Sequence, residues 1–227
     1  MTDLGCAAPH PTHRLIPSRF PPVGAFDTVA TAADARAVME LEEWTNDRLV
    51  AERLRRLPEA EWVYGSPNSS VVMAAFLHAP LDGARFSGPD LGAWYAAAAI
   101  TTAVAEVAHH LRREAVARGL PEARRVYRAY TARLLGDDYL DLRRMQASKP
   151  DVYAPDSYAA SQILGEMVRA SGRSGIVYDS VRHAGGTNVV VHRPRHVTEV
   201  TQAAHYDIIV PVVGRIVVLP AKPASAP

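Results

Sequence analysis

The chain has 227 residues, of which 48% are hydrophobic and 22% are charged, and its formal net charge at pH 7 is +1. These values are ordinary for one globular domain, and so small a net charge argues against direct nucleic-acid binding, which needs a concentrated basic surface. A single cysteine, Cys6, excludes an intramolecular disulfide, and no apolar run approaches the ~20 residues of a membrane span, so we expect a cytoplasmic protein without a membrane partner.

The N-terminal half predicts a loose start followed by a strand and helices. Residues 1–12 are expected to be flexible, and 13–22 predict a short strand that ends at its prolines. Residues 31–57 are rich in Ala, Glu, Leu and Arg at helical spacing, with a break near Thr45, and predict two helices. The apolar run 70–79 predicts a strand.

The middle of the chain predicts a helix, a strand and a second helix. Residues 98–118 carry one apolar stripe at helical spacing and are followed by Gly119, a typical helix stop. Residues 124–135 alternate enough to predict a strand. Asp156 is expected to cap a helix that ends at Gly172.

The C-terminal part predicts further strands. The β-rich runs 175–180 and 187–192 flank a glycine-containing connection, which predicts a hairpin. Residues 206–219 predict one or two strands, and 220–227 a disordered tail. The expected fold is therefore a single α+β domain, with a mixed or antiparallel β core flanked by helices. No glycine-rich fingerprint follows a strand, so dinucleotide binding of the Rossmann type is not supported.

Two polar residues stand out because of their neighbours. Glu106 lies at the edge of the apolar stripe of 98–118, where a carboxylate is costly unless it is hydrogen-bonded; a half-solvated surface Glu is the alternative. Ser180 ends an apolar strand, and is either a turn former or a hydroxyl presented to a cleft. The nine histidines bring no three or four metal ligands together by spacing, so we expect no metal.

Three segments, in order, resemble the RES domain family: HRLIPSRFPP at 13–22, ARFSG followed by WYAA and TAVAE within 84–106, and YDSVRHAGGTNVVV at 178–191. The resemblance spans most of the chain and implies a RES domain over 13–219, with a helical insertion at about 31–57. It implies a fold similar to that of ADP-ribosyltransferases. It also implies a toxin of a toxin–antitoxin pair that consumes NAD⁺ by hydrolysis or phosphorolysis.

The resemblance assigns roles residue by residue. It implies catalytic roles for Arg14, Glu106 and Ser180, and NAD⁺ binding by Arg14, Tyr95, Arg85, Ser180 and Asn188. A carboxylate near the ribose would stabilise positive charge that develops during bond cleavage, and arginines would bind the pyrophosphate. Where family members have Asn after the Arg-aromatic pair, this chain has Ser87. NAD⁺ is then a substrate, and no cofactor is expected.

The resemblance leaves the acceptor of the ADP-ribose group open between water, phosphate and a protein side chain. ADP-ribosylation of a protein target is therefore an alternative function, and a catalytically idle, partner-binding member is another. A helix-turn-helix antitoxin is the expected protein partner, and a homo-oligomer is compatible with the family by analogy alone.

Overall fold

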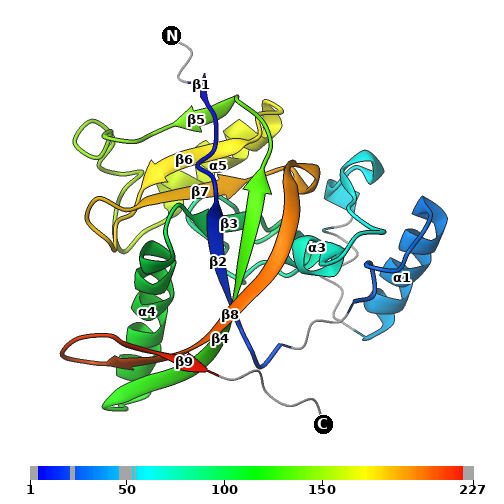
Figure 1. Cartoon of the computed structure of the whole chain (residues 1–227). Helices are drawn as coiled ribbons and strands as arrows, with labels where there is room; N and C mark the ends of the chain where they lie inside the picture. The colour runs from blue at the N-terminus through cyan, green and yellow to red at the C-terminus, as the bar shows by residue number, and fades with distance from the viewer. Residues whose placement is uncertain (1–4, 21–23, 46–52, 54, 222–227) are drawn as a thin grey trace.

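A twisted nine-stranded sheet organises the residues that the computed structural model describes, which are 5–20, 24–45, 53 and 55–221 (Figure 1). Its strand order is β1-β5-β6-β7-β3-β2-β4-β8-β9, and every neighbouring pair is antiparallel except β5 with β6. The strands are β1 (Gly5–Cys6), β2 (Thr12–Pro17), β3 (Trp94–Ala97), β4 (Glu122–Leu134), β5 (Tyr139–Asp141), β6 (Gly175–Asp179), β7 (Thr187–Val191), β8 (Val197–Pro211) and β9 (Val217–Ala221).

Helices cover both faces of this sheet. The described helices are α1 (Ala32–Thr45), α3 (Ser69–Leu77), α4 (Ile100–Ala117) and α5 (Ala159–Ala170), with 3₁₀ turns η1 (Glu59–Glu61) and η2 (Pro194–His196). In Figure 1, α4 lies on one side of strands β2, β4 and β8, and α1 and α3 lie on the other. Successive strand residues face opposite sides, so Trp94 joins the core cluster of α3, whereas Ala97 joins that of α4. The predicted single α+β domain is confirmed.

The strand predicted at 70–79 is wrong, because residues 70–77 belong to α3. An apolar run without a period does not distinguish a buried strand from a buried helix, and here the tertiary contacts decide. The side chain of Asp27 accepts the backbone N–H groups of Asn68 (2.9 Å) and Ser70 (2.8 Å), which satisfies donors that a helix start leaves free. The helix is buried on most sides, which explains the absence of an amphipathic pattern.

Other boundaries also differ from expectation. Helix α5 begins at Ala159 without a side-chain cap, so the capping role predicted for Asp156 is wrong. Gly5–Cys6, within the segment expected to be loose, pair with β5. Strand β8 begins at Val197 rather than at residue 206, and β9 extends to Ala221. The second helix predicted within 31–57 falls mostly outside the described residues, as do 222–227 of the predicted tail.

The predicted hairpin is confirmed and places one polar residue centrally. Strands β6 and β7 pair from Gly175–Val191 to Asp179–Thr187, and β7 also pairs with β3. Asn188 is opposite Tyr178 on one side and Ala97 on the other, so its backbone is fixed by both neighbours. Helix α4 starts three residues after β3, which brings its first turns next to this part of the sheet.

Candidate active site

A cleft of about 870 Å³ opens beside α4 and β3, within the range of small-molecule sites. Its walls include the loop that carries Arg85 and the segment that leads into α5. Five of the six residues that the resemblance assigned line it: Arg14, Arg85, Tyr95, Glu106 and Asn188. The sixth, Ser180, is buried directly behind Glu106, to which it is hydrogen-bonded.

The carboxylate of Glu106 is fixed through one of its two oxygens. Its Oε1 accepts hydrogen bonds from Ser180 Oγ and Asn188 Nδ2, each at 2.6 Å. Hydrogen bonds to an ionised carboxylate are short and strong, so this oxygen is firmly held. Oε2 makes no hydrogen bond with any described residue. The arrangement therefore holds the charged group in place and leaves its second oxygen open to a ligand.

The hydroxyl of Ser180 is fully used within the protein. Its proton goes to Glu106, and its oxygen accepts the backbone N–H groups of Arg182 (3.1 Å) and His183 (2.9 Å). A serine that caps the following backbone in this way is typical of a turn. Ser180 thus positions Glu106 and shapes the β6–β7 connection, and it has no proton left to donate to a ligand.

Arg14 lies where two strands separate. Strands β2 and β3 share a single register pair, His13 with Ala97, and the Arg14 side chain donates from Nη1 to the carbonyl of Tyr95 at 2.9 Å. The guanidinium stands 4.7 Å from the centre of the Trp94 ring. Burial lowers the pKa of Arg14 to about 10, so it remains charged at neutral pH.

The charge of Arg14 is not neutralised by a neighbouring acid. It forms no ion pair with any carboxylate in the described part of the chain, and its Nε is buried without a hydrogen-bond partner there. A cation held partly away from solvent without a counter-charge is costly. The site is therefore prepared for an anion.

Tyr95 supports the wall of the cleft through its hydroxyl. The hydroxyl oxygen accepts the backbone N–H of Phe86 at 3.0 Å and lies 3.0 Å from Ser87 Oγ. Burial raises the pKa of Tyr95 to about 12, so the group stays protonated. The side chain of Tyr95 is held by β3 at its backbone and by Phe86 and Ser87 at its hydroxyl, so the orientation of the ring is fixed.

Arg85 lines the cleft and is hydrogen-bonded to the segment before α5. Its Nη1 donates to the carbonyls of Val152 (3.1 Å) and Ala154 (3.0 Å), and its guanidinium lies 4.9 Å from the centre of the Tyr158 ring. Arg85 therefore connects the loop before α5 to the cleft, as well as lining it.

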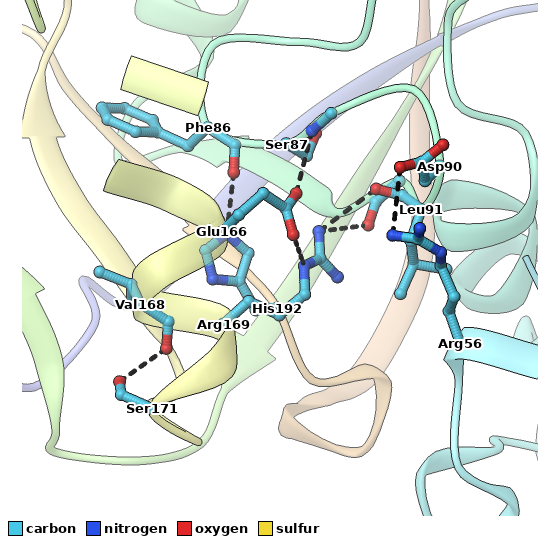
Figure 2. A network of polar contacts seen from close by, with 12 residues as sticks. Arg56, Phe86, Ser87, Asp90, Leu91, Glu166, Val168, Arg169, Ser171 and His192 are labelled. Carbon is cyan, nitrogen blue, oxygen red and sulfur yellow. Dashed lines mark hydrogen bonds and ion pairs between the residues drawn. The ribbon is translucent and has the colours of Figure 1, made fainter. Parts of the chain in front are cut away.

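Side chains of α5 form hydrogen bonds with the backbone of the loop at 86–92 (Figure 2). Glu166 Oε1 accepts the backbone N–H of Gly88 at 2.9 Å. Arg169 Nη2 donates to the carbonyl of Gly92 at 2.9 Å. His192 contributes Nε2, 3.2 Å from the carbonyl of Phe86. Burial lowers the pKa of His192 to about 3, so the ring is neutral and this nitrogen acts as the donor. The loop that presents Arg85 and Ser87 is thereby anchored to α5.

Sequence reasoning missed several residues that line the cleft. They are His110, Arg113, Tyr158, Tyr178 and Arg182. The first two were detectable, because they follow Glu106 on α4 at spacings of four and seven and so share its face. The others come from a strand and two connections, where no periodic signal points to them.

Within the described residues, no three side chains of His, Cys, Asp or Glu converge as metal ligands would. In the same part of the chain, no helix combines the length and the apolar character needed to cross a membrane.

Comparison with known proteins identifies the family of the chain. No curated protein matches the chain with significance. A chain in the crystal structure of the M. tuberculosis MbcT–MbcA toxin–antitoxin complex aligns with a TM-score of 0.48 and 15% identity, covering 89% of this chain and 86% of that one. The family model for the RES domain matches residues 53–210, which include all the assigned site residues except Arg14. Since that match covers well over half of its length, the chain belongs to the RES domain family.

Proposed function

We propose that this protein cleaves NAD⁺ at the bond between nicotinamide and ribose. The observation that carries the proposal is Glu106, whose carboxylate is fixed through Oε1 and open at Oε2 inside a cleft. Breaking this bond releases neutral nicotinamide and leaves positive charge on the ribose, as in glycoside hydrolysis. A carboxylate held in advance stabilises that charge without reorganising during the reaction.

Arg14 gives the second support, because NAD⁺ carries a pyrophosphate. A guanidinium with no acidic partner in the described chain is a suitable receptor for that group, and its planar fork matches phosphate oxygens. Arg85 lines the same cleft and, in this proposal, contributes further positive charge. The fixed ring of Tyr95 offers a flat surface for the nicotinamide.

Ser180 and Asn188 act in this proposal through Glu106. Both donate to the same carboxylate oxygen, and Asn188 additionally lines the cleft, within reach of a bound ligand. A catalytic group is effective only when neighbouring residues lock its geometry, and these two donors provide that support.

The experiment that tests the activity follows NAD⁺ and its products by chromatography. Purified protein is incubated with NAD⁺ in phosphate-free buffer, in phosphate buffer, and with cell lysate and labelled NAD⁺. Release of nicotinamide in any of these conditions supports the proposal. The second product then identifies the acceptor: free ADP-ribose for water, its 1″-phosphate ester for phosphate, and a labelled protein band for ADP-ribosylation. Intact NAD⁺ in all three conditions contradicts the proposal.

We also propose that the protein acts as a toxin restrained by a helix-turn-helix antitoxin. The support is its membership of the RES domain family. Induced expression in a bacterial host tests the first part. Wild-type protein is expected to lower cellular NAD⁺ and arrest growth, whereas Glu106→Gln is expected to be tolerated at equal expression. Co-expression of a small helix-turn-helix protein encoded beside this chain is expected to restore growth.

A further inference from the structure

Helix α4 contributes a second ionisable side chain to the cleft, that of His110. His110 follows Glu106 by four residues, one helical turn, and both side chains line the cleft. Unlike Glu106, the imidazole of His110 makes no hydrogen bond with any described residue. A ring that is unpartnered, reachable and one turn from the carboxylate is available to a molecule bound beside Glu106.

Charged groups from two elements surround this ring. Arg113 lies on the same helix, and Arg182 comes from the β6–β7 connection. The ring of His109 on α4 also lies nearby, with the two ring centres 5.5 Å apart. Burial lowers the pKa of His110; Glu106 opposes this, and the two arginines lower it further. The imidazole is therefore neutral at neutral pH and able to accept a proton.

Glu106 is poorly placed to take a proton during the same reaction. Its function in the proposed cleavage depends on negative charge beside the ribose, and that charge is lost on protonation. Its Oε1 is also occupied by two donors at 2.6 Å. A neutral nucleophile must lose a proton as it attacks, so a separate base is required.

We propose that His110 is the general base that serves water as the acceptor, an inference that rests on the proposed cleavage of NAD⁺. The water oxygen forms a bond to the anomeric carbon of the nicotinamide-bearing ribose (C1″ of the product), and the bond from this carbon to the nicotinamide nitrogen breaks, with its electron pair passing to that nitrogen. The unprotonated ring nitrogen of His110 takes the water proton, and the O–H electron pair stays on oxygen. The imidazolium then releases the proton to solvent.

The proposed role of His110 applies to water as the acceptor and not to phosphate. A phosphate dianion already carries a nucleophilic oxyanion and need not lose its remaining proton as it attacks, so its attack on C1″ needs no base. Removing the imidazole should therefore slow hydrolysis selectively. General-base catalysis typically contributes about 10²–10⁴-fold, so we expect a loss of hydrolysis of about 100-fold or more.

The test measures both products in one reaction. His110→Gln is incubated with NAD⁺ and phosphate, and the ratio of ADP-ribose to its 1″-phosphate ester is compared with that of wild-type protein. A ratio is independent of the fraction of folded enzyme. His109→Gln is the matched control, because it removes the adjacent imidazole of α4, which does not line the cleft. We expect the ratio to fall about 100-fold in His110→Gln, and to stay within about 3-fold of wild type in the control.

A pH profile supplies a second readout. Wild-type hydrolysis in phosphate-free buffer should decline at acidic pH, with an apparent pKa below the ordinary value of about 6.5 for histidine, and His110→Gln should lack this limb. An unchanged product ratio, or an acidic limb whose midpoint is the same in the variant as in wild-type protein, overturns the role of His110 while leaving NAD⁺ cleavage intact. Wild-type protein that forms only the phosphate ester also overturns it. Wild-type protein that consumes no NAD⁺ contradicts the proposed function itself.

Discussion

Substitution of Ser180 by Ala separates a positioning role from direct contact with substrate. The variant removes one of the two donors to Glu106 Oε1, and it removes the acceptor for the N–H groups of Arg182 and His183. Asn188 still donates to the carboxylate, so Glu106 stays in the cleft but is held from one side only. We therefore expect weakened catalysis together with a less stable β6–β7 connection.

The magnitudes follow from these contacts. A hydrogen bond to a charged group contributes about 1.5–3 kcal/mol, so its full loss in the transition state lowers kcat by about 10- to 150-fold. Two half-buried N–H groups without their acceptor are partly satisfied by water, and we expect the free energy of unfolding to fall by about 1–2 kcal/mol. The KM for NAD⁺ should stay within about 3-fold, because ground-state binding does not use the hydroxyl.

Steady-state release of nicotinamide and urea unfolding measure these quantities. Ser171→Ala is the matched control, since that hydroxyl donates to the carbonyl of Val168 in α5 and lies away from the cleft. A rise in KM with unchanged kcat in Ser180→Ala would refute the positioning role and indicate direct contact with NAD⁺.

Two further predictions address binding and the scaffold. Arg14→Gln removes the unneutralised cation and should raise the KM for NAD⁺ by about 10- to 100-fold, the equivalent of about 1.4–2.8 kcal/mol, and an unchanged KM would exclude Arg14 from pyrophosphate binding. Gly165→Ala places a Cβ 2.1 Å from the backbone oxygen of Phe86, so α5 must move away from the loop that it anchors. We expect about 1–3 kcal/mol of destabilisation in urea unfolding, and wild-type stability would show that α5 is not tightly packed there.

Glu106 and Ser180 could each be selected from the sequence as candidate site residues, but the contact between them could not be predicted. Glu106 is conspicuous at the edge of the apolar stripe of a helix, and Ser180 follows an apolar strand. Their contact depends on β7 pairing with both β6 and β3, which is a property of sheet order and not of local pattern. The family resemblance groups these residues because members of one family share a fold, and with it the order of the strands.

Other features depend on contacts far apart in the chain. Strand β3 has four residues and β5 has three, too few to show a period of two. Helix α3 lacks a polar face, because the protein surrounds it, and its start is set by the distant Asp27. Arg85 was expected to bind substrate, and its sequence context gives no sign that it also holds backbone carbonyls at 152 and 154.

The most direct test of the account is the rate of nicotinamide release by Glu106→Gln. This variant removes the negative charge at nearly constant volume. Glu122→Gln, on an exposed residue at the start of β4, is the matched control. Since electrostatic stabilisation by one fixed group typically contributes about 10²–10³-fold, we predict a fall in kcat of that size for Glu106→Gln, with KM for NAD⁺ nearly unchanged and the control equal to wild type. Undiminished turnover of NAD⁺ by Glu106→Gln would contradict the account.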